Sequence, residues 1–115
     1  MTWMPVAGAV ITFGLGMLGL LNPLAAARFT SLEPKGKVGL SEIRATYGGL
    51  FAALGLAALL MPGSASHQVV GFAWAGAAIG RSGSVIVDRS LSPKNFGGIL
   101  MEAGIAALFL APYYW

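Results

Sequence analysis

Four long apolar stretches divide the chain, and short polar segments separate them. They cover about residues 3–21, 43–61, 68–88 and 96–112. Each is close to the roughly 17–25 residues that an α-helix needs to cross a bilayer, and their nearly continuous apolar character is typical of membrane spans. We therefore expect an all-α fold: an integral membrane four-helix bundle that forms a single domain over residues 1–115.

Residues suited to helix caps lie between these stretches. Asn22 followed by Pro23 is typical of an N-cap and the first helical position, and predicts a short interfacial helix over about residues 23–32. Ser41 suits an N-cap for the second span. Ser92, followed by proline, suits one for the fourth.

Rows of small residues recur every three or four positions in the first three spans. Such rows let two helices approach closely in a membrane. They predict a compact bundle in which a leucine at position 80 would separate helices, and they leave a homodimer or a larger membrane complex open. The rows are Gly8, Thr12 and Gly16; Gly48, Ala52 and Gly55; and Gly76, Gly80 and Ser84.

The composition agrees with a lipid bilayer as the main partner. The chain is 57% hydrophobic and 10% charged, whereas a soluble domain has about a quarter of its residues charged. It has no cysteine, which excludes thiol chemistry and thiolate metal sites. The single histidine, His67, argues against a histidine-rich metal or haem site, and we expect it in an exposed loop. We predict no cofactor, no metal and no nucleic acid partner.

The basic residues predict the orientation in the membrane. All seven lie in or beside the first and third connections: Arg28, Lys35, Lys37, Arg44, Arg81, Arg89 and Lys94. By the positive-inside rule, these connections face the cytoplasm and both termini face the outer, periplasmic side. Trp3 and the aromatic residues 113–115 then lie at the outer interface, where aromatic belts form.

Polar residues inside the spans predict a cytoplasm-facing pocket. Arg81 precedes Arg89 by eight residues, so it lies about 12 Å deeper along a helix. Glu102 reaches a similar depth from the start of the fourth span, and a deep arginine in a membrane needs such a partner. Residues from neighbouring turns and from the second span complete a candidate ligand-binding set: Arg44, Tyr47, Arg81, Ser84, Asp88 and Glu102.

A structural interpretation of the same residues stands beside the functional one. Arg81 and Glu102 could form an ion pair that only fixes helix register, because a buried pair is weak support for function. Arg44 and Asp88 could be interfacial charges solvated by lipid headgroups.

Several segments together resemble a known family. They are Asn22-Pro23, the Arg-Ala-Thr-Tyr-Gly-Gly run at 44–49, Gly80-Arg81 with Asp88, and Glu102. They are similar to a bacterial family of small four-helix membrane proteins of unknown function, DoxX-like in layout. The resemblance implies a multi-pass protein of the bacterial inner (cytoplasmic) membrane, in which Arg44, Arg81, Asp88 and Glu102 form one set. It also implies a glycine after Asp88, where this chain has Arg89.

Three functions fit these observations. The first is binding or transport of a lipid-like or small anionic ligand at the Arg81–Glu102 cluster, because the guanidinium fork suits oxyanions. The second is an accessory structural subunit of a larger membrane complex. The third is a membrane enzyme that uses Glu102 as an acid or base, although no recognisable catalytic motif supports it.

Overall fold

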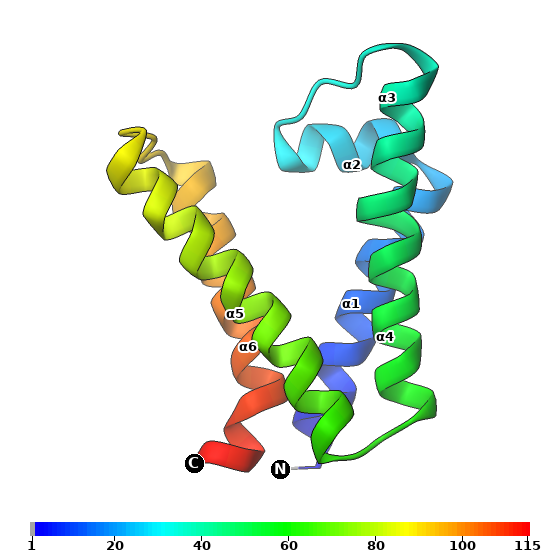
Figure 1. Ribbon diagram of the computed structural model, residues 1–115, viewed down its shortest axis with the longest axis vertical. Helices are drawn as coiled ribbons and strands as arrows, with labels where there is room; N and C mark the ends of the chain where they lie inside the picture. Colours follow the sequence, from blue (N-terminus) through cyan, green and yellow to red (C-terminus); the bar gives the residue numbers. More distant parts are fainter. Residues whose placement is uncertain (1) are drawn as a thin grey trace. The chain divides into compact units, whose positions relative to one another are not determined.

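The computed structural model describes residues 2–115, and these residues form helices and no strands (Figure 1). Four helical segments are long and apolar enough to cross a membrane: Trp3–Leu21, Gly36–Leu60, Ser64–Val87 and Pro93–Tyr114. The four predicted spans are thus confirmed as candidates. In chain order the elements are α1 (Trp3–Leu21), α2 (Pro23–Thr30), α3 (Gly36–Ile43), the π-helix η1 (Arg44–Leu50), α4 (Phe51–Leu60), α5 (Ser64–Val87) and α6 (Pro93–Tyr114).

The proline-associated caps form as the sequence predicts. The Asn22 side chain accepts a hydrogen bond from the Ala25 amide at 3.2 Å and begins α2. The Ser92 hydroxyl accepts one from the Asn95 amide at 3.1 Å and begins α6. Each cap satisfies an amide that has no partner within its own helix.

The second span begins earlier than the sequence suggests. Its helix runs without interruption from Gly36 through α3, η1 and α4, whereas we expected a start near residue 43. Ser41 is therefore not an N-cap. Its hydroxyl donates to the Lys37 carbonyl one turn earlier, at 3.1 Å, which is a bond that serine makes inside a helix.

At the end of α5, Arg89 occupies a backbone position that favours glycine. Asp88 is the C-cap, and Arg89 follows in the left-handed region with φ of 51°. The Ser90 amide donates to the Val85 carbonyl at 3.3 Å, which is the longer bond of a Schellman ending. Glycine is the usual residue at this position because it has no Cβ, so Arg89 carries a local conformational cost.

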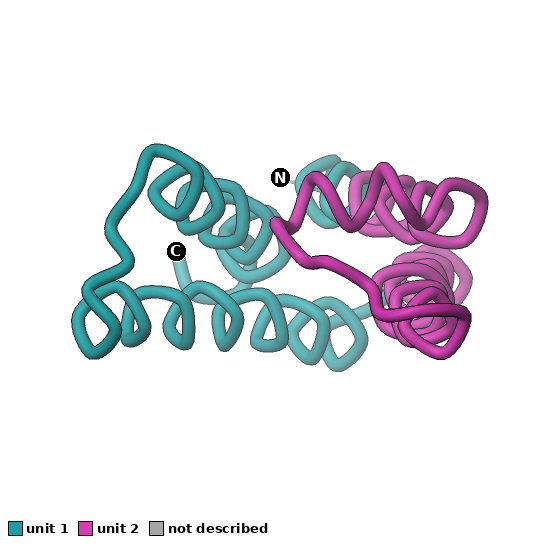
Figure 2. Tube along the Cα trace, turned by 90° about the horizontal axis from the view of Figure 1, so that it is seen from above, with its two compact units in different colours: residues 1–8, 62–115 teal, residues 9–61 magenta. Residues whose placement is uncertain are grey.

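The chain divides into two compact units, which Figure 2 distinguishes by colour and which we describe separately. Unit 2 is Ala9–Met61. Unit 1 combines Met1–Gly8 with Pro62–Trp115, and Met1 lies outside the described residues. The bundle of one domain stays a prediction.

Unit 2 is held together by close backbone contact between α1 and the long second span. A Cβ added at Gly16 would lie 2.1 Å from the Ala52 amide nitrogen, and one added at Gly55 would lie 2.4 Å from the Phe13 nitrogen. A Cβ added at Gly19 would lie 2.1 Å from the Tyr47 carbonyl oxygen. The predicted close contact is therefore confirmed at Gly16, Ala52 and Gly55, because only a missing side chain allows this approach.

In unit 1, α5 and α6 run side by side in opposite directions (Figure 1). Phe109 is fully buried, and its ring occupies the space that a side chain at Gly8 would need. The packed face of α5 includes Val70, Gly71, Trp74 and Ala78.

The predicted contact row of α5 lies on another face of that helix. Among the described residues, no atom comes within 4 Å of a Cβ added at Gly76 or Gly80, and both glycines are exposed. Within unit 1, Gly80 therefore lies outside the α5–α6 contact, and its close packing against another helix of the bundle stays a prediction. Spacing alone indicated a smooth face, but it could not show which side of α5 meets α6.

Candidate functional site

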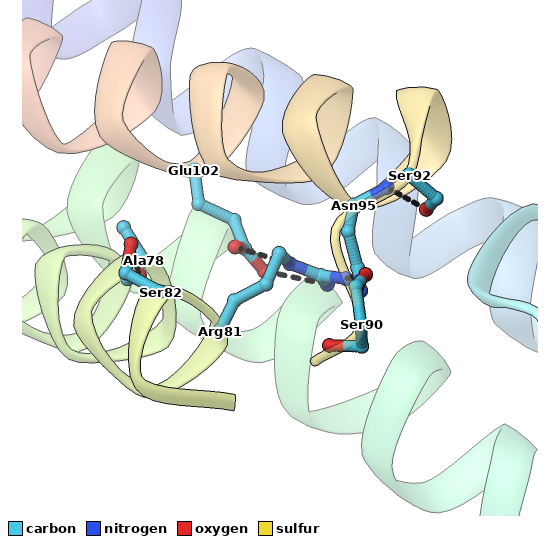
Figure 3. Close-up of polar contacts among 7 residues, drawn as sticks. All are labelled: Ala78, Arg81, Ser82, Ser90, Ser92, Asn95 and Glu102. Carbon is cyan, nitrogen blue, oxygen red and sulfur yellow. Dashed lines mark hydrogen bonds and ion pairs between the residues drawn. The ribbon is translucent and has the colours of Figure 1, made fainter. Parts of the chain in front are cut away.

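Arg81 and Glu102 form a two-point ion pair between α5 and α6 (Figure 3). Arg81 Nε donates to Glu102 Oε1 at 2.8 Å, and Nη2 donates to Oε2 at 3.0 Å. This fork-to-carboxylate arrangement is the strong, directional form of the interaction. The predicted pair is confirmed, and the helices that carry it are neighbours as expected.

Asn95 is a third member of this cluster that the sequence-based set omitted. Its Oδ1 accepts a hydrogen bond from Arg81 Nη1 at 2.9 Å, while its Nδ2 donates to the Ser90 carbonyl at 2.7 Å (Figure 3). The side chain therefore ties the guanidinium to the loop between α5 and α6. Asn95 lies seven residues before Glu102 on the same helix face, a periodicity that could have identified it.

Gly98 provides the space for the guanidinium. A Cβ added there would lie 2.8 Å from Arg81 Nε and 2.9 Å from Cζ. Gly98 lies three residues after Asn95 and four before Glu102, so all three are on one face of α6. The Arg81 guanidinium therefore lies against this face of α6, in the space above Gly98 and between Asn95 and Glu102.

We expect Gly98→Ala to displace the Arg81 guanidinium and weaken the pair, whereas Gly97→Ala should not. A Cβ at Gly97 meets nothing within 4 Å among the described residues. The flexible arginine can yield, so the loss should be about 1–2 kcal/mol. Unfolding in detergent with increasing dodecyl sulfate would compare the two variants. Equal stability of both would contradict the assigned role of Gly98.

The two charged groups differ in exposure. The Glu102 side chain is 9% exposed, whereas the Arg81 side chain is 32% exposed. The carboxylate is therefore enclosed and neutralised by the arginine, while part of the arginine lies at the surface.

Ser84 and Asp88 lie together at the end of α5. The Ser84 hydroxyl donates to Asp88 Oδ2 at 2.7 Å, and the Asp88 amide donates to the Ser84 carbonyl at 2.8 Å. Asp88 is exposed. These contacts give both residues a part in ending the helix, and the predicted membership of the ligand site stays a prediction.

Arg44 and Tyr47 belong to unit 2, where both lie in the π-helix η1. Arg44 Nη1 donates to the Leu20 carbonyl and so satisfies the C-terminal end of α1. The Tyr47 ring packs edge-on against Phe51, with centroids 5.7 Å apart. Their place in a common site with Arg81 and Glu102 stays a prediction, because those two residues belong to unit 1.

His67 is not in an exposed loop. Because α5 begins at Ser64, His67 falls in its first turns and is only 9% exposed. Its Nδ1 lies 2.6 Å from the Tyr113 hydroxyl, and its ring contacts Phe109. The early start of α5 converts the expected loop residue into part of the α5–α6 interface. Among residues 2–115 no group of three metal-ligating side chains is present.

The four apolar helical segments define the chain as a multi-pass membrane protein. The chain belongs to the family described as Domain of unknown function (DUF4345), which matches residues 1–112. No curated protein and no solved structure matches the chain. The family supplies no activity, so the function has to be inferred from the residues themselves.

Proposed function

We propose that this small membrane protein binds or transports a lipid-like or small anionic ligand at the Arg81–Glu102 cluster. The observation that carries the proposal is the unequal exposure of the pair, 32% for the Arg81 side chain and 9% for that of Glu102. Arginine binds carboxylates and phosphates through its planar fork, and intramembrane charges commonly mark ligand pathways. The Asn95 amide lies beside the guanidinium and adds a second polar group.

Glu102 lowers the affinity of Arg81 for an anion. Because its carboxylate offsets the charge of Arg81, an anion beside the exposed part of the Arg81 side chain feels only a partial attraction. We therefore expect reversible binding, as exchange or transport of the ligand requires.

The proposed setting is a four-helix bundle with a DoxX-like layout in the bacterial inner membrane. The distribution of basic residues supports a cytoplasmic location for the two basic connections and periplasmic termini. The cluster would then lie about 9 Å inside the cytoplasmic end of α5, because Arg81 precedes Val87 by six residues. Reporter fusions after Trp115 should behave as periplasmic, and cytoplasmic behaviour would overturn this orientation.

The binding test compares the wild type with Arg81→Met combined with Glu102→Met. Both proteins are extracted in mild detergent, and the anionic lipids and acids that remain bound are measured by mass spectrometry. The double variant keeps the volume but lacks both charges, so we expect it to retain at least about fivefold less ligand, whereas Lys94→Gln on the same connection should match the wild type. Equal retention by all three proteins would refute the proposed site.

An accessory structural subunit is the second candidate. The exposed Gly76 and Gly80 on α5 favour it, because an uncovered small-residue face can accept a helix of another protein. In this case the double methionine variant should retain the cellular phenotype, while Gly80→Leu should abolish association with the partner and leave the isolated protein folded.

A further inference from the structure

The large apolar side chains of α2 lie on its exposed side, and only small residues lie on its packed side. Within unit 2, the buried residues of α2 are Pro23, Ala26 and Ala27, which are small. Leu24 and Phe29 instead remain 52% and 51% exposed. A short helix on a water-facing surface normally shows the opposite distribution, with its large apolar residues packed inside. The outer side of α2 is therefore suited to an apolar medium.

The direction of α2 agrees with a position in the membrane interface. Figure 1 shows α2 crossing the direction of the long second span, which belongs to the same unit. When that span crosses the bilayer, α2 lies along the bilayer plane. Helices in this position insert large apolar residues to the boundary between headgroups and acyl chains.

Exposed cations lie on this side of α2 and in the turn that follows it. Arg28 lies between Leu24 and Phe29 on the outer face of α2, and the turn into α3 adds Lys35 and Lys37. Glu33 offsets one of these charges. The two lysines also lie at the N-terminal end of the long second helix, where positive charge is unfavourable unless an anion is near. The α2–α3 surface, as we define it, consists of Leu24, Arg28, Phe29, Leu32, Lys35 and Lys37.

We propose that the α2–α3 surface binds the headgroups of anionic phospholipids while Leu24 and Phe29 insert among their acyl chains. Basic residues beside a membrane span attract anionic lipids, and the apolar residues between them select a bilayer over a soluble anion. Only residues of unit 2 take part. The proposal is therefore independent of the function proposed for Arg81 and Glu102.

Insertion can be tested with one labelled residue, because the chain has no cysteine. Phe29→Cys carries a nitrobenzoxadiazole label, the protein is reconstituted in vesicles with equal amounts of phosphatidylcholine and phosphatidylglycerol, and Glu33→Cys serves as the reference. The label at position 29 should be quenched by nitroxides on lipid acyl chains and protected from aqueous iodide, whereas the label at position 33 should be open to iodide. Quenching of position 29 by iodide would overturn insertion. Protection from both quenchers would indicate that protein covers this surface, and would also overturn it.

Selectivity for anionic lipid is tested with Lys35→Gln combined with Lys37→Gln. Native mass spectrometry gives the ratio of phosphatidylglycerol to phosphatidylcholine bound after extraction from the same vesicles. Removing two surface cations should lower this ratio about tenfold at low salt, whereas Lys35→Arg with Lys37→Arg should preserve it. An unchanged ratio in the glutamine variant would contradict the proposal even if Phe29 proves to be inserted. The double methionine variant of unit 1 should leave this lysine dependence intact.

Discussion

Replacing Glu102 with alanine should destabilise the protein by about 3 kcal/mol. Removing one partner of a buried ion pair leaves the other charge without compensation, and such changes cost about 3–5 kcal/mol. We expect the lower end of this range because the remaining charge, on Arg81, is 32% exposed and can be partly solvated. The free energy of unfolding in detergent, measured by circular dichroism during titration with dodecyl sulfate, would show the loss.

The double variant Arg81→Met with Glu102→Met separates the charge from the packing. Apolar residues of similar volume remove both charges together, so the double variant should recover part of the stability that Glu102→Ala loses. Additive losses from the two methionine substitutions would mean that the side chains contribute independently. The two hydrogen bonds at 2.8 and 3.0 Å would then add no coupling free energy between Arg81 and Glu102.

Gly16→Ala should separate α1 from the second span in unit 2. The added Cβ would lie 2.1 Å from the Ala52 nitrogen, and backbone cannot yield as a flexible side chain does. Extra volume in a packed interior costs about 1–3 kcal/mol, and contact with backbone places this variant at about 3 kcal/mol.

Gly14→Ala is the matched control on the same helix. A Cβ at Gly14 meets nothing within 4 Å among the described residues, so the variant should unfold as the wild type does. Similar accumulation and similar unfolding of the Gly14 and Gly16 variants would contradict the close approach of these helices.

The sequence predicted the helices well because membrane spans require long apolar runs. It also predicted Asn22 and Ser92 as caps, since each precedes a proline, which is favoured at the first helical position. It could not predict that the second helix starts at Gly36. Pro34 and Gly36 are helix breakers and Ser41 is a weak helix former, so the polar stretch resembled a loop.

Part of the candidate site was also predictable. Arg81 and Glu102 are charges deep in apolar runs, and each needs a partner there. Asn95 and Gly98 were missed because they carry no charge, and their roles follow from the position of the Arg81 side chain. The face of α5 that meets α6 could not be derived from spacing, so the sequence did not show that Gly80 lies outside this contact.

The most direct test of the proposed binding site at Arg81 and Glu102 is a crystal structure, from crystals grown in a lipidic phase with native lipids. We expect the Arg81 and Glu102 side chains to face each other and to form two hydrogen bonds. We also expect electron density of a headgroup or small acid beside the exposed part of the Arg81 side chain. The proposal would be contradicted if the two side chains pointed to lipid on different faces. It would also be contradicted if protein covered the exposed part of the Arg81 side chain.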